Sequence, residues 1–147
     1  MSKQMNKKQK NEQKNNIIKI TIHGNPATKK NSSNIYRSPS GKPFVSTSTS
    51  YKKYLEEFRI QILQNKLQNK HLNDSFNIKC EYYMQTKRRV DLTNLLSATM
   101  DCLVTCGVLE DDNCLIAVSN DGSRVFYDKE NPRVEIEITK TEQTFIK

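Results

Sequence analysis

The chain has 147 residues, of which 35% are hydrophobic and 7% aromatic, so it can form one domain with a modest core. Lys and Arg number 24 against 16 Asp and Glu, and the net charge of +8 favours a polyanionic partner or an anionic surface. No apolar run approaches the roughly 18 residues of a membrane span, and the polar amino terminus lacks the apolar core of a secretory signal. We therefore expect a cytoplasmic protein with no membrane partner.

The first 16 residues are predicted to be a disordered basic arm, because they hold five lysines, one glutamate and almost nothing to bury. The folded domain then covers residues 17–147. Its first element is a strand over residues 17–22, where three isoleucines alternate with polar residues. This strand ends at Gly24-Asn25-Pro26.

Residues 24–50 are predicted to form one long loop rich in Ser, Asn, Lys, Gly and Pro. Loops longer than about 12 to 15 residues in compact domains are usually functional or disordered. Lys29 and Lys30 are cations of the kind that contact phosphate. The composition fits a nucleic-acid-binding loop and a solvated polar linker equally well.

A helix is predicted to start at Ser50, a suitable N-cap, with apolar residues at helical spacing as far as Leu67. Its outer face mixes both charges, so we interpret that face as solvent-facing. Residues 76–84 alternate as a strand.

A second helix is predicted between Asp91 and Gly107. Residues 113–118 and 123–127 follow as strands or as a hairpin that turns at Asn120-Asp121-Gly122, and residues 133–139 form the last strand. The elements describe an α+β fold, a single small domain with two main helices and a mixed sheet of about four strands.

Acidic residues flank the second helix, with Asp91 before it and Asp111-Asp112 after it. Singly, Asp91 is explained as an N-cap and the pair as a solvated turn. Together, beside the basic run Lys87-Arg88-Arg89, these carboxylates would repel a docked polyanion unless cations bridge them. Mg²⁺ takes carboxylate, water and phosphate oxygens and can activate water for phosphodiester hydrolysis. The pattern indicates a metal-dependent nuclease.

The four cysteines allow another interpretation, a zinc module, because Cys102 and Cys106 share a helical face and Cys114 is near in sequence. The spacing fits no common zinc motif, and neither histidine is close. We expect reduced thiols in the core instead.

The segment RRVDLTNLLSATMDCLVTCGVLEDDN resembles the core motif of RusA-type Holliday-junction resolvases: D-x-D-N, a helix with an internal Asp, a Gly turn and a DD pair before a strand. The matching positions, without a gap, are Asp91, Asn94, Asp101, Gly107, Asp111 and Asp112. Weaker similarity extends over residues 18–138.

The resemblance implies a homodimeric, Mg²⁺-dependent endonuclease, for which Mn²⁺ could substitute, of a kind common in phages and prophages. It would bind four-way junction DNA and cut it by paired nicks during recombination and repair. Asp91 and Asp112 are then catalytic, with Asp111 the next candidate. We expect metal ligands at Asp91, Asp111, Asp112 and Asn94, DNA contacts at Lys29, Lys30, Lys87, Arg88 and Arg89, and supporting roles for Thr93 and Asp101.

Two positions depart from the family pattern. Thr93 replaces the second Asp of D-x-D-N, and Ser97 replaces a Lys. A hydroxyl is a poorer metal ligand than a carboxylate, and Ser97 offers no cation. Either neighbouring residues fill these roles, or the protein is a catalytically weakened, non-enzymatic junction or duplex DNA-binding protein. We favour the first because three aspartates remain.

Helix geometry separates the predicted ligands. A helix over residues 92–106 is about 20 Å long, and the six residues that follow could return to Asp91 only if fully extended. We therefore expect Asp91 of one subunit to meet Asp112 of another. Asp101 is too far from Asp91 to share its metal, and we expect it to pair with a basic group or face solvent. The wide apolar side of the helix predicts burial on two sides. It is either a central helix packed on a sheet, or a helix whose second side meets another subunit.

Overall fold

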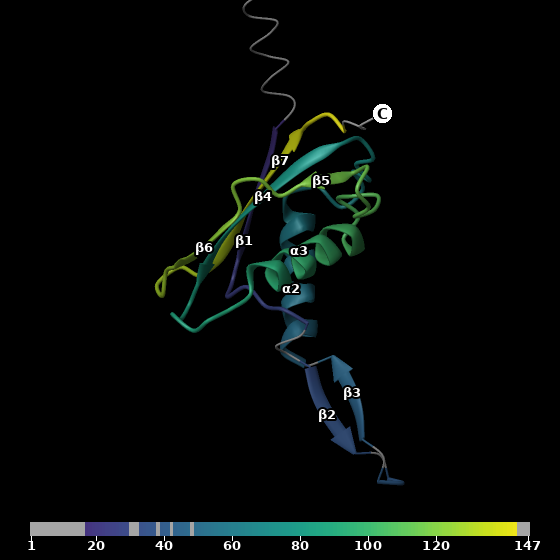
Figure 1. The fold of residues 1–147 in the computed structure, drawn as a ribbon, viewed down its shortest axis with the longest axis vertical. Helices are drawn as coiled ribbons and strands as arrows, with labels where there is room; N and C mark the ends of the chain where they lie inside the picture. Colours follow the sequence, from purple (N-terminus) through teal and green to yellow (C-terminus); the bar gives the residue numbers. More distant parts are fainter. Residues whose placement is uncertain (1–16, 30–32, 38, 42, 48, 144–147) are drawn as a thin grey trace, which may run out of the picture.

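The structure is a computed structural model that describes residues 17–29, 33–37, 39–41, 43–47 and 49–143. These residues form a five-stranded mixed sheet, two helices and a separate two-stranded hairpin (Figure 1). The predicted α+β class is confirmed. The predicted basic arm and Lys30 lie outside the described residues. Within the described part, neither helix is long and apolar enough to cross a membrane.

Three long strands form most of the sheet: β1 (Ile17–His23), β4 (Phe76–Met84) and β7 (Arg133–Lys140). β7 lies between the other two and is antiparallel to both. Two short strands, β5 (Ala117–Ser119) and β6 (Arg124–Tyr127), pair in parallel with β4 on its other side. The three long strands match their predicted positions, because alternation identifies a strand with one buried face.

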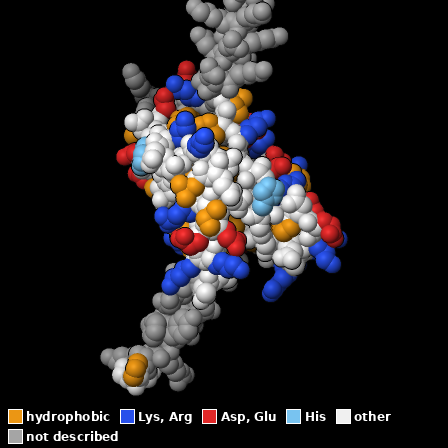
Figure 2. Space-filling view, turned by 180° about the vertical axis from the view of Figure 1, so that it is seen from behind, with side chains coloured by type: hydrophobic (Ala, Val, Ile, Leu, Met, Phe, Trp, Pro, Cys, Tyr) orange, Lys and Arg blue, Asp and Glu red, His pale blue; other side chains and the backbone are white. Residues whose placement is uncertain are grey.

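The two faces of the sheet differ in chemistry. Alternate residues are buried under the helices: Ile20, Ile22, Ile78, Cys80, Tyr82, Val134, Ile136 and Ile138. On the opposite face the ammonium of Lys79 lies 3.5 Å from carboxylate oxygens of Glu81 and Glu137. The surface seen in Figure 2 likewise carries acidic and basic side chains side by side.

Helix α2 (Thr49–Gln64) buries an apolar stripe of Tyr51, Tyr54, Phe58 and Ile62. It starts one residue before Ser50, so the prediction of Ser50 as its N-cap is wrong. Leu67 lies beyond the helix, where its N–H donates to the carbonyl of Ile62 at 3.2 Å.

Helix α3 (Leu92–Thr105) is buried on two sides within one chain. Toward the sheet, the hydroxyls of Tyr82 and Thr99 share a hydrogen bond of 2.7 Å. Toward α2, the Tyr51 hydroxyl lies 3.8 Å from the Cys102 sulfur. The predicted two-sided burial is confirmed, and α2 covers the second side.

The prediction of one long loop over residues 24–50 is wrong in part. This segment contains an antiparallel hairpin of β2 (Ser33–Arg37) and β3 (Pro43–Thr47). The sequence does not indicate the two strands clearly, because their short runs of strand-forming residues lie among many polar residues. Of the two alternatives predicted after Asn113, separate strands and a hairpin, the structure has separate strands. β5 pairs with the start of β4 and β6 with its end, and both run parallel to it. The turn between them therefore displaces the chain along β4 without reversing it.

Candidate active site and nucleic-acid interface

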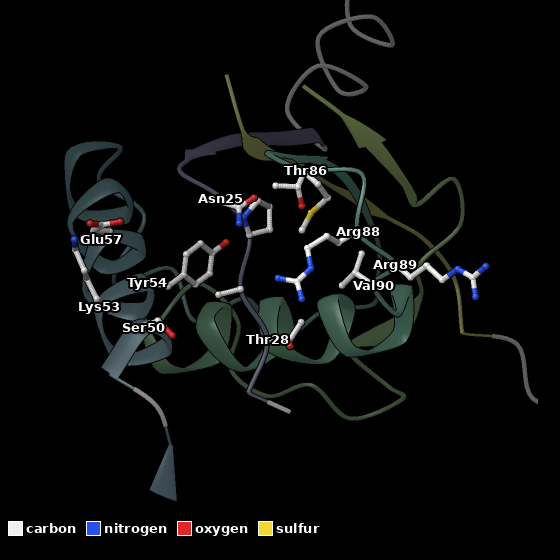
Figure 3. A pocket seen from close by; sticks show the side chains of 13 residues that line it. Asn25, Thr28, Ser50, Lys53, Tyr54, Glu57, Thr86, Arg88, Arg89 and Val90 are labelled. Atoms are coloured by element: carbon white, nitrogen blue, oxygen red, sulfur yellow. The ribbon is translucent and has the colours of Figure 1, made fainter. Parts of the chain in front are cut away.

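A cleft of about 850 Å³ lies between the start of α2, the segment after β1 and the segment before α3 (Figure 3). Its charged lining residues are Lys53, Arg88 and Arg89 against a single acid, Glu57. Figure 3 shows Arg88 extending into the cleft, whereas Arg89 points away from it. The cleft therefore offers a basic, polar surface that suits a phosphate backbone.

The segment after β1 is fixed at both ends. The N–H of Gly24 donates to the carbonyl of Pro132 at 3.0 Å, and the side-chain oxygen of Asn25 accepts from the N–H of Gln85 at 2.9 Å. Thr28 is 4% exposed and buried beside α3. These contacts hold one wall of the cleft in place.

Lys29 follows this segment and reaches α3. Its ammonium lies 3.0 Å from a carboxylate oxygen of Asp101 and 5.6 Å from the centroid of the Tyr51 ring. The structure thus brings together a predicted DNA contact and the internal Asp of the helix.

The basic run before α3 is exposed. The ammonium of Lys87 lies 5.1 Å from the centroid of the Tyr127 ring, which is a cation–π contact. Arg88 and Arg89 line the cleft directly before Val90 and Asp91. Cations and the first predicted ligand therefore occupy the same end of α3.

Asp91 is exposed and occupies the N-cap position of α3 without a side-chain bond to the helix backbone. Instead, its Oδ2 accepts a hydrogen bond of 3.2 Å from the side-chain amide of Asn94. Thr93 and Ser97 are exposed on the same helix. The Asp91 carboxylate is thus oriented by a neighbour and open to solvent.

Asp111 and Asp112 are exposed beyond the other end of α3. One oxygen of Asp111 accepts from the Asp112 N–H at 2.8 Å, and the other accepts from the Asn113 amide at 3.0 Å. The hydrogen bond from Asn113, with a smaller contribution from Asp112, holds the pKa of the Asp111 carboxyl below its ordinary value. Asp111 is therefore an ionised and well-positioned carboxylate.

The segment leading to these aspartates is anchored elsewhere in the fold. Leu72 forms an isolated parallel bridge with Leu109, and the N–H of Glu110 donates to the Leu72 carbonyl at 3.0 Å. The His71 Nδ1 lies 3.1 Å from a Glu110 carboxylate oxygen. The segment after Gly107 therefore runs beside residues 71–72.

Within one chain, Asp91 precedes α3 and the aspartate pair follows it, and this helix of 14 residues is about 21 Å long. Among the described residues, no group of three or more His, Cys, Asp or Glu side chains could hold a metal ion. Each end of α3 still offers exposed oxygen donors, Asp91 with Asn94 and Asp111 with Asp112. Because Mg²⁺ often uses only one or two protein carboxylates and completes its shell with water and phosphate, the donors fit this ion.

The cysteines are free thiols, three of them buried. Burial raises the pKa of Cys80 to about 12 and that of Cys102 to about 11. Cys114 is exposed, so the expectation of a core thiol is wrong for this cysteine. The burial of the other three agrees with their interpretation as core residues.

Lys53 was not predicted as a site residue. Helical periodicity places it on the outer face of α2, where the mixed charges predict a solvent-facing surface. In the fold, the segments around Thr28 and Arg88 approach that face and enclose the cleft with it. Periodicity gives the side of a helix, but it does not indicate which distant segment lies beside it.

A small α+β domain with a basic cleft and an exposed, oriented aspartate, Asp91, directly after one of its walls is typical of proteins that act on nucleic acids. Comparison with known families identifies this one more closely. The chain belongs to the endodeoxyribonuclease RusA family, which matches residues 18–139, from β1 into β7. No curated protein matches the chain. The resemblance of the central motif is thereby confirmed, and family membership implies an endonuclease that resolves Holliday junctions.

Proposed function

We propose that this protein is a cytoplasmic, Mg²⁺-dependent and structure-selective endonuclease that resolves four-way DNA junctions by paired nicks during recombination and repair. The observation that carries the proposal is the position of the basic cleft. Its cations Arg88 and Arg89 are separated from Asp91 in the chain only by Val90. A DNA backbone held in the cleft would therefore pass the first predicted metal ligand.

The side chains of the site fall into two groups, those that would bind DNA and those that would hold the metal ion. Lys53, Lys87, Arg88 and Arg89 would contact phosphates, together with Lys29 and Lys30. Asp91, Asn94, Asp111 and Asp112 would hold Mg²⁺, or Mn²⁺ in its place. The bound ion would activate water and stabilise the leaving oxygen. Asn94 would keep the Asp91 carboxylate oriented, while the turn at Asn113 does the same for Asp111.

Paired nicks require two sites, and a homodimer with a two-fold axis suits a two-fold junction. The separation of Asp91 from Asp112 along α3 favours a site completed across the subunit interface. In the short strand β6, Val125 and Tyr127 lie on the same face and are 39% and 46% exposed, so they offer an apolar surface for a second subunit.

A second candidate function is junction or duplex binding without cleavage. It is favoured by Thr93 and Ser97, which lie exposed on α3 where the family pattern has Asp and Lys. A pure binder would weaken with salt according to its phosphate contacts but would show no carboxylate-dependent response to Mg²⁺.

The test uses a synthetic four-way junction with the unmodified protein and with Asp112→Asn, each with and without Mg²⁺. We expect nicked duplexes from the unmodified protein. Asp112→Asn should bind within about threefold of the unmodified protein but cut about 100-fold more slowly or worse. Asp121→Asn, an exposed aspartate in the turn before β6, is the matched control and should cut normally. Junction binding without cleavage by the unmodified protein in any divalent ion would establish the non-enzymatic alternative.

A further inference from the structure

We propose that Asp101 is a positioning residue that holds the ammonium group of Lys29 over the exposed face of α3, where this lysine supplies a positive charge that the helix itself lacks. The charge would act on the phosphate being cleaved. The inference deepens the proposed nuclease function and rests on it.

Helix α3 has no basic residue of its own, because the sequence LTNLLSATMDCLVT contains neither Lys nor Arg. Its polar residues Thr93, Asn94, Ser97 and Asp101 follow a spacing of three and four, so they share one side of the helix. Thr93 and Ser97 are exposed, and the other two are partly so. A DNA strand passing this side toward Asp91 would meet only neutral and acidic groups from α3.

Lys29 brings a cation to this side from a distant part of the chain. Its Nζ lies 3.0 Å from Oδ2 of Asp101, and 52% of its side chain is exposed. Side chains on a helix lean toward its N-terminus, so the Asp101 carboxylate lies over the preceding turn, which contains Ser97. The ammonium of Lys29 therefore lies near the space that a lysine at position 97 would reach.

The cation is held in place before any substrate arrives. The ring of Tyr51 also contacts it, with the ring centroid 5.6 Å from Nζ. The residues just before it are anchored, since Pro26 and Thr28 are buried and Asn25 is bonded to Gln85. A preorganised charge is effective in catalysis because it needs no rearrangement when negative charge develops.

The competing explanation is an ordinary surface ion pair that fixes the loop. Exposed ion pairs contribute little to stability. An ordinary surface pair should therefore affect neither the stability nor the cleavage rate, whereas the proposed role affects the cleavage rate alone. The chain offers a matched control in Lys140, whose Nζ lies 2.8 Å from Oδ2 of Asp74, with 51% of its side chain exposed. Lys140→Met removes the same charge and an equivalent pair from a position outside the proposed site.

The experiment measures the cleavage rate at saturating Mg²⁺ and saturating four-way junction. We expect Lys29→Met to lower kcat about 100-fold and Lys140→Met to leave it within about twofold. Asp101→Ala should lower kcat about tenfold, because Lys29 is retained but no longer held. Adding Ser97→Lys to Lys29→Met should recover at least about tenfold, since α3 then carries the charge itself. A structural anchor would not be rescued in this way.

The midpoint temperature of thermal unfolding, Tm, of each variant should agree with that of the unmodified protein to within about 3 °C. If Lys29→Met unfolds earlier, Lys29→Gln, which keeps most of the stem beside Tyr51, decides the kinetic comparison. Should the unmodified protein cut while Lys29→Met matches Lys140→Met, or should Ser97→Lys restore nothing, the inference is wrong and the nuclease function stands. No cleavage by the unmodified protein would overturn both.

Discussion

The side-chain amide of Asn94 donates a hydrogen bond of 3.2 Å to Oδ2 of Asp91. The contact takes the place of the side-chain cap that Asp91 does not form, so the helix start presents an oriented carboxylate instead of a satisfied cap. Neighbours that orient a metal ligand typically change metal affinity by about 10-fold to 100-fold when they are removed. We expect Asn94→Ala to raise the Mg²⁺ concentration for half-maximal cleavage by about tenfold or more.

The measurement is a Mg²⁺ titration of junction cleavage beside a metal-free binding assay. Asn65→Ala is a suitable control, because the Asn65 amide donates to the backbone carbonyl of Gln61 at an exposed helix end. A Mg²⁺ requirement for Asn94→Ala equal to that of the control would show that Asn94 does not act through the metal.

Among the glycines of the described residues, we expect Gly107 to cause the largest loss of stability when it is replaced by alanine. Its φ is 78°, and a Cβ there would lie 2.0 Å from the backbone oxygen of Gln68. That backbone is held nearby, because the His71 N–H donates to the Gly107 carbonyl at 3.0 Å. Gly107→Ala should cost at least about 2 kcal/mol of unfolding free energy, measured by urea denaturation.

Gly122→Ala separates the two causes of this loss. Gly122 also has a positive φ, 87°, but the nearest atom to its added Cβ is the flexible Cδ of Lys79 at 2.8 Å. Only the backbone strain remains there, so we expect a cost of about 1 kcal/mol. Equal costs at the two glycines would mean that the contact with Gln68 is not rigid.

Thiol reactivity tests the position of the cysteines. Burial raises the pKa of Cys80, Cys102 and Cys106, while Cys114 is exposed. Because the thiolate is the reactive form, a thiol-specific reagent at about pH 8 should label one cysteine per native chain and all four in denaturant. Cys114→Ser should abolish the native reaction. Fast labelling of a second thiol, or stoichiometric zinc in the purified protein, would contradict the assignment of core thiols.

The helices and strands of the core could be predicted because their apolar residues recur at the spacing that places them on one buried face. Strands β1, β4 and β7 each alternate, and the alternation specifies both the strand and the side that packs on the helices. The limits of α3 were readable from Asp91 and Gly107, since a polar residue before the helix and a glycine with positive φ after it are local requirements.

Contacts between distant segments could not be predicted in the same way. β5 and β6 pair in parallel with opposite ends of β4. This pairing depends on the path of the chain after Asn113, which turn residues alone do not specify. The ion pair of Lys29 with Asp101 and the entry of Lys53 into the cleft depend on two chain segments meeting. Local patterns identified the candidate ligands, and only the fold assigned their neighbours.

Mixing two inactive variants tests whether the site is shared between subunits. If Asp91 of one chain works with Asp112 of its partner, a heterodimer of Asp91→Asn and Asp112→Asn contains one intact pair and one doubly altered pair. Random subunit exchange should then restore about a quarter of the cleavage sites, seen as single nicks in a junction assay. Asp111→Asn mixed with Asp112→Asn is the control, because both changes lie on one segment and leave no intact pair. If each site belongs to one chain, neither mixture will cut, and the helix-spanning separation of Asp91 and Asp112 would have to close within the subunit.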